Sequence, residues 1–336
     1  MPPTRRRAAL VAALVLAAGW TTTSCGIHLA EAPPAVPTPD AAEIARSGAV
    51  EAAERIGAVA RAASSSVTDP GLSNVLDQIA AGSATQAETL GGTWTPPPRP
   101  TPSSTDPSDP ASSSSAPTAA TLEDVLVALS EGATTARDGS TTSDPTLGRL
   151  LLSVALWRDL AAFELTRAAD AAGEGEAVQA VTLSRGGIDD AALQVSTLGS
   201  SPELVRGLDG TAFTYEALAA RTSDETSRAT WVARAAALRR AGDTVAVASG
   251  VAGTSNDPRQ GFYDVASVLA LDETAAVATL EASLAELWVN ADAPGALRPT
   301  VADAALESYL LALQTGATLA PLDSSAVVLP GLVTPS

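Results

Sequence analysis

The stretch that decides the fold runs from 144 to 172 and spells DPTLGRLLLSVALWRDLAAFELTRAADAA. Asp144 is a good N-cap residue, and Pro145 occupies the first helical position, where a missing N–H costs nothing. Apolar side chains then recur at helical spacing, at Leu147, Leu150, Leu151, Val154 and Ala161. The pattern predicts one long amphipathic helix that ends near Ala172, before Gly173.

The same signals recur elsewhere in the chain. Asp69-Pro70 predicts the start of a second helix of this kind, and Gly91-Gly92 ends that helix. Thr121 with Asp124 approximates a capping box. Further helices are expected to begin with N-caps at Thr38, Asp272 and Thr300, and at Ser201 and about Asp224, each followed by apolar residues at helical spacing.

The expected fold class is all-α. We predict an N-terminal helical domain over 38–175, in which two helical hairpins are joined by a disordered Ser/Thr/Pro loop at 93–120. A second region over 200–333 has two more hairpins, joined by a long link at 250–271. Residues 173–200 carry no clear periodicity.

The first residues predict export. Arg5, Arg6 and Arg7 form a positive segment before an apolar stretch at 8–20, which is too short to cross the ~30 Å hydrocarbon core of a bilayer. We therefore expect a signal peptide at 1–24. The arginines also leave a twin-arginine signal open, although the Phe-Leu usual after the pair is missing.

Cys25 is the only cysteine of the chain. The sequence around Ser24-Cys25 resembles a lipobox, in which the cysteine is acylated and becomes the new N-terminus. It departs from that motif at Thr22, where leucine is preferred. We expect lipidation at Cys25 and a proline-containing tether at 25–37, which also holds the only histidine, His28. A secretory signal with an incidental cysteine and an uncleaved anchor are the alternatives.

Charge and composition limit the function. The net charge is −18, which disfavours binding to nucleic acid. Beyond Cys25 and His28 the chain has no thiol and no imidazole, and lysine is absent throughout. These absences exclude Ser-His and Cys-His pairs, zinc sites with nitrogen or sulfur ligands, Schiff bases and the P-loop lysine. We therefore predict no enzyme activity and no cofactor.

A few residues could still carry chemistry. Glu216, Glu281 and Glu307 lie on three expected helices and Asp243 on a fourth, so an all-oxygen metal site is conceivable. Solvated carboxylates are the simpler interpretation, and we predict no metal site. Glu174 and Glu176 lie in a glycine-containing break where no cleft can be inferred, so they are poor catalytic candidates. The tryptophans on helical segments are expected to pack in the core, at Trp157, Trp231 and Trp288.

The C-terminal region has short motifs in a fixed order. These are the stretch at 215–221 (YEALAAR), Asp257-Pro258, Phe262-Tyr263, Thr279-Leu280-Glu281 and Pro330-Gly331-Leu332. In this order the region resembles an uncharacterised ferritin-like domain family of actinobacterial lipoproteins. The resemblance implies a ferritin-like four-helix bundle and an extracytoplasmic location, and it supplies no catalytic residues. Leu208 and Asp209 stand where that family often has Glu-His.

Together these features predict a non-catalytic envelope lipoprotein. The chain would be lipid-anchored on the extracytoplasmic side of the cell membrane, and its helices would bind an envelope protein or a cell-wall component. The alternative is a ferritin-like metal or redox protein with atypical carboxylate ligands, and a carrier of a hydrophobic ligand is a third hypothesis.

Overall fold

The computed structural model describes residues 38–93, 120–175 and 201–314, and every regular element in these ranges is helical. The all-α prediction is confirmed for this part of the chain. The elements are α2 (Ala41–Ser64), α3 (Pro70–Thr89), α4 (Leu122–Thr142), α5 (Pro145–Ala172), α7 (Pro202–Arg221), α8 (Glu225–Ala248), α9 (Ala266–Leu269), α10 (Glu273–Val289), the 3₁₀ turn η3 (Gly295–Leu297) and α11 (Arg298–Gln314).

Most helices begin at the residue that the sequence predicts. Asp69 accepts a hydrogen bond from the Leu72 N–H, and Thr121 and Asp124 form a complete capping box. Asp144, Asp224 and Asp272 likewise accept from backbone N–H groups of the first turns of α5, α8 and α10. These side chains satisfy N–H groups that have no partner within the helix.

Two predicted N-caps are wrong. The first helix is capped by Asp40, whose carboxylate accepts from the Glu43 N–H, and not by Thr38. The last helix begins at Arg298 and not after Thr300, because η3 leads directly into it and removes the need for a side-chain cap. The short helix α9, inside the link between α8 and α10, was not predicted.

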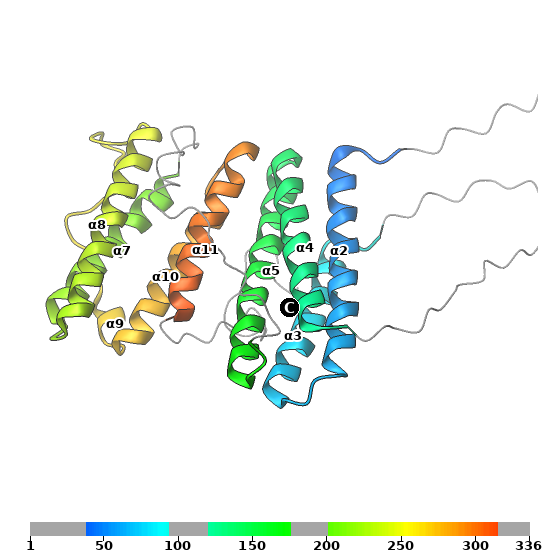
Figure 1. The fold of residues 1–336 in the computed structure, drawn as a ribbon. Helices are drawn as coiled ribbons and strands as arrows, with labels where there is room; N and C mark the ends of the chain where they lie inside the picture. The colour runs from blue at the N-terminus through cyan, green and yellow to red at the C-terminus, as the bar shows by residue number, and fades with distance from the viewer. Residues whose placement is uncertain (1–37, 94–119, 176–200, 315–336) are drawn as a thin grey trace, which may run out of the picture. The chain divides into compact units, whose positions relative to one another are not determined.

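The four N-terminal helices pack as two antiparallel hairpins (Figure 1). α2 contacts α3 and α4, while α5 contacts α4 and α3, so each helix has two principal neighbours. Leucine, isoleucine and alanine side chains fill the space between them. Gly82 of α3 allows close approach, since a Cβ there would overlap the ring of Trp157 on α5.

In the C-terminal part, α7 packs along α8 and contacts α10, and α10 packs along α11. α11 also contacts α5 and α4, so the two predicted helical regions share one buried apolar cluster. Trp157, Trp231 and Trp288 are all buried, which confirms the prediction that they pack in the core. None of the described helices is long and apolar enough to cross a membrane.

Candidate functional site

The carboxylates singled out as conceivable metal ligands are paired with arginines. The Glu281 side chain on α10 is fully buried, and it accepts hydrogen bonds from Arg234 Nε at 2.9 Å and Nη2 at 2.6 Å. Tyr215 Oη on α7 donates to Glu281 Oε1 at 2.6 Å. Arg234 Nη1 also donates to Glu307 Oε1 on α11 at 2.5 Å. One guanidinium on α8 thus joins groups from α7, α10 and α11.

The other two predicted ligands lie apart from this cluster. Glu216 accepts from Arg239 Nε at 3.1 Å and Nη2 at 3.0 Å, and Asp243 accepts from Arg259 of the link. Among the described residues there is no group of three or more His, Cys, Asp or Glu side chains that could hold a metal ion. A cation at Glu281 and Glu307 would have to displace Arg234 from both carboxylates.

Asp209 and Leu208, where the resembled family often has Glu-His, have separate roles. Leu208 is fully buried in the apolar core. Asp209 accepts from Arg239 and from Tyr263 Oη, the latter at 2.7 Å. Tyr263 also packs on Phe213 with ring centroids 5.8 Å apart, so these contacts hold the link against α7.

Burial and charge shift the pKa of the tyrosines in these clusters. Burial raises the pKa of Tyr215, and the neighbouring Glu281 carboxylate raises it further. Burial, with the hydrogen bond to Asp209, raises the pKa of Tyr263 to about 12. Both phenols are therefore neutral hydrogen-bond donors at physiological pH, and neither is poised to act as a base.

A buried arginine in the N-terminal helices was missed by the sequence reasoning. Arg158 on α5 is fully buried. Its Nε donates to Gln86 Oε1 on α3 at 3.0 Å, its Nη1 to the Gly132 carbonyl on α4 at 2.7 Å, and its Nη2 to the Ala49 carbonyl on α2 at 2.9 Å. Burial lowers the pKa of this guanidinium, yet it remains charged at neutral pH, so neutral oxygens from three helices solvate a buried charge.

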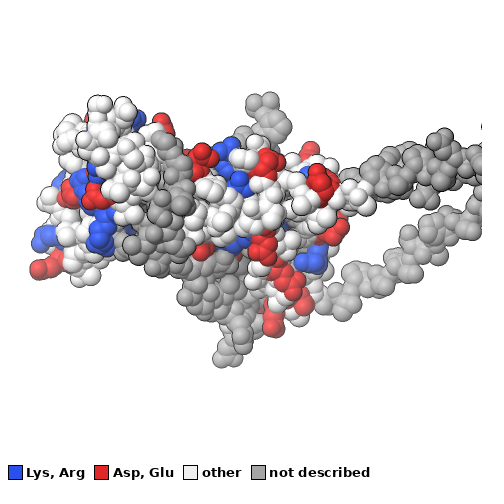
Figure 2. Space-filling view, turned by 90° about the horizontal axis from the view of Figure 1, so that it is seen from above, with Lys and Arg blue, Asp and Glu red and all other residues white. Residues whose placement is uncertain are grey.

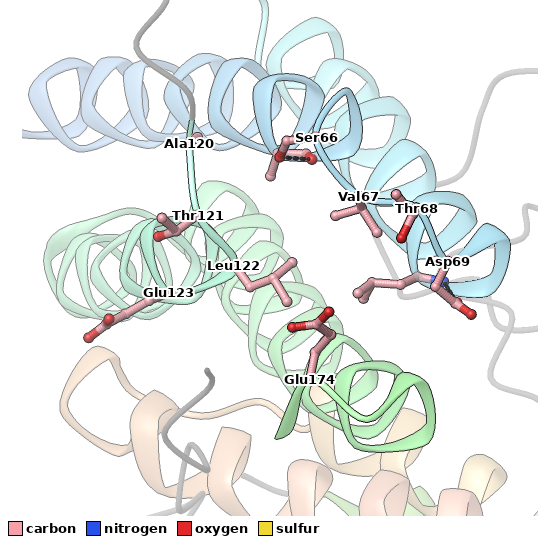
Figure 3. A pocket seen from close by; sticks show the side chains of 11 residues that line it. Ser66, Val67, Thr68, Asp69, Ala120, Thr121, Leu122, Glu123 and Glu174 are labelled. Carbon is pink, nitrogen blue, oxygen red and sulfur yellow. Dashed lines mark hydrogen bonds between the residues drawn. The ribbon is translucent and has the colours of Figure 1, made fainter. Parts of the chain in front are cut away.

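A cavity of about 460 Å³ lies where four helix ends meet, at the end of α2, the starts of α3 and α4, and the end of α5 (Figure 3). Ala63, Val67, Leu72 and Leu122 give it apolar walls, and Ser66, Thr68 and Thr121 contribute hydroxyl groups. Three carboxylates also line it, from Asp69, Glu123 and Glu174. The sequence alone did not indicate a cleft at Glu174, and the structure places this residue at one.

Local backbone geometry places Glu174 at this cavity. Gly173 has a φ of +78° and ends α5 in the left-handed conformation that glycine adopts without strain. The Glu174 N–H then donates to the Ala169 carbonyl at 2.8 Å, which turns the chain back over the helix end. The sequence predicted each of the four helix ends separately, but it gave no sign that they converge.

The predicted lipidation site, Cys25, and the lone His28 lie outside the described residues, as does Glu176. On the face seen in Figure 2, acidic and basic side chains stand close together, in keeping with the arginine–carboxylate pairs described above. Comparison with models of protein families, with curated proteins and with solved structures finds no match to this chain. The resemblance to ferritin-like domains of lipoproteins therefore stays a prediction.

Proposed function

We propose that this chain is an envelope lipoprotein, exported and held on the extracytoplasmic side of the cell membrane by an acylated Cys25. Its helices form a non-catalytic module that acts by binding an envelope protein or a cell-wall component. The anchor is supported by the order of Arg5–Arg7, the apolar stretch at 8–20 and Ser24-Cys25. The acidic surface favours solubility outside the cell and disfavours nucleic acid as a partner.

The single observation that carries the non-catalytic assignment is that the buried charges join helices to one another. Arg234 with Glu281, and Arg158 with its three neutral acceptors, connect different helices to one another. Burying a charge of this kind costs free energy unless the charge is fully hydrogen-bonded, so its partner groups are held in these hydrogen bonds. General acid–base catalysis instead needs a group that is within reach of substrate and free to exchange a proton.

We also propose that α7, α8, α10 and α11 form the ferritin-like bundle that the resemblance implies. The support is the meeting of side chains from all four helices at Arg234, together with the long link between the two helical pairs. In this proposal the guanidinium supplies the positive charge that a metal ion supplies in carboxylate-rich bundles.

Membrane fractionation of the full chain with labelled palmitate tests the anchor. In a bacterial host that acylates lipoproteins, we expect the wild type in the membrane fraction and labelled, and Cys25→Ala unlabelled and released. His28→Ala, a change in the same segment, is the matched control and should behave as wild type. A Cys25→Ala chain that stays with the membranes would contradict the acyl anchor and indicate an uncleaved span.

A further inference from the structure

The cavity at the four helix ends has an unbalanced charge. Three carboxylates line it, and none of its lining residues is basic. A second cavity of about 390 Å³ is lined by residues of α2 and α4, among them Val127 of α4. Its charge is different, because the basic side chain of Arg55 lines it together with Asp124 and Glu131. Arg55 Nη2 lies 3.5 Å from Glu131 Oε2 there, so part of that charge is already paired.

Of the three carboxylates in the first cavity, Glu174 is the one available to a ligand. Asp69 Oδ1 accepts from the Leu72 N–H at 2.8 Å and thereby caps α3. Glu123 lies in the first turn of α4, where its charge favours the helix dipole, and its side chain points away from the cavity in Figure 3. The exposed Glu174 side chain points into the cavity beside Leu122, and its carboxylate makes no hydrogen bond or ion pair with another described side chain.

The rest of the cavity is suited to an apolar group. Leu72 and Ala63 line it and are fully or almost fully buried, and Val67 and Leu122 point into the same space. Its volume falls in the range of about 300–1,000 Å³ that is typical of small-molecule sites, which combine apolar walls with a few polar groups. An anion would meet the negative charges of Asp69 and Glu174 here, whereas a cation would be attracted.

We propose that this cavity binds a small organic cation with an apolar body, whose ammonium group pairs with Glu174 while its apolar part packs on Leu72, Val67 and Leu122. The proposal rests on the proposed function of the chain as a binding module, and it names the chemical class of a ligand. Organic amines, including those of lipid or cell-wall precursors, share this chemistry.

Isothermal titration calorimetry of the full chain in detergent, with hexylammonium, hexanol and hexanoate, tests the charge preference. These probes share one alkyl chain and differ in charge. We expect affinity to fall in the order hexylammonium, hexanol, hexanoate, and the hexylammonium affinity to fall as salt is raised. Equal affinity for the three probes, or no binding of hexylammonium, would overturn the proposal.

Glu174→Gln tests the assigned residue, because it keeps the shape of the side chain and removes its charge. We expect about a fivefold loss of hexylammonium affinity, as for an exposed ion pair, and no change for hexanol. The matched control is Glu88→Gln, an exposed glutamate in the last turn of α3, far along that helix from the Leu72 end. Unchanged hexylammonium binding in Glu174→Gln, or an equal loss in the control, would contradict the assignment.

The calorimetric result is independent of the anchor. If the probes fail to bind while Cys25→Ala still leaves the membrane fraction, the cation site is wrong and the proposed lipoprotein function stands. If Cys25→Ala remains membrane-bound while the probes bind as expected, the anchor is wrong and the site stands.

Discussion

Arg158 lies among leucine and alanine positions of α5, on a face where only apolar residues would ordinarily be expected. Its charge is retained inside the bundle because three oxygens, from α2, α3 and α4, accept its hydrogen bonds. Gly132 contributes its carbonyl and also space, since a Cβ there would lie 3.1 Å from Arg158 Nη1. The helical spacing of Arg158 with Leu151, Val154 and Leu165 was the signal in the sequence that could have identified it as buried.

Arg158→Met should destabilise the fold by about 1–3 kcal/mol, because Gln86 loses its donor in a buried site. Gln86→Leu alone should have a similar cost, since Arg158 Nε then has no acceptor. The double variant should recover most of the loss, because an apolar pair of similar volume replaces a buried polar one. Urea unfolding of the wild type, the two single variants and the double variant measures the coupling between Arg158 and Gln86. If the two losses in free energy of unfolding simply add in the double variant, the Arg158–Gln86 contact contributes nothing.

The raised pKa values of the three tyrosines predict that the fold loses stability at alkaline pH. The pKa of each of Tyr215, Tyr263 and Tyr309 is raised above 10.0, with burial as the largest cause. Between pH 10 and the folded-state values the native chain binds more protons than the unfolded chain, so stability is full below about pH 10 and falls as pH rises further. Near-ultraviolet absorbance should show little tyrosinate at pH 10–11 in the native chain and about half-titration near pH 10 in urea. A native tyrosine titrating near 10 would contradict the burial.

At the scale of elements, local signals predicted the helices well and their meeting points poorly. Asp-Pro pairs, the capping box at Thr121 and Gly173 act within one turn of backbone, so the sequence alone identifies them. The start of α11 depends on the preceding turn η3, and no N-cap residue in the sequence marks this turn. The cavity needs four separate helix ends to converge, and this is decided by side-chain packing between segments far apart in the chain.

Two helical glycines should respond in opposite ways to alanine. At Gly48 of α2 the nearest contact of an added Cβ is Thr135 at 3.7 Å, an ordinary packing distance, so Gly48→Ala should stabilise by about 0.5–1 kcal/mol. At Gly82 the added Cβ overlaps the Trp157 ring, so Gly82→Ala should destabilise by about 1–3 kcal/mol. Thermal unfolding measures both, and stabilisation by Gly82→Ala would show that α3 and α5 are not closely packed at this point.

At the scale of the whole chain, polar contacts of α11 reach both parts of the described structure. Arg298 donates to the Ser140 carbonyl and, at 2.9 Å, to that of Ser143, near the end of α4. Arg137 on α4 pairs with Asp159 on α5 at 2.6 Å and lies 3.8 Å from Asp303 on α11. The composition indicated that arginine is the only abundant cation, but not that these side chains would join helices from the two halves of the chain.

The buried charges of this chain connect its helices, and we propose that the chain acts by contact. Elemental analysis of the purified full chain, produced with added iron and manganese, tests this most directly. We predict metal far below one ion per chain, because Arg234 already occupies the carboxylates of Glu281 and Glu307. Near-stoichiometric iron or manganese that is lost in Glu281→Gln would contradict the claim and establish a metal protein in its place.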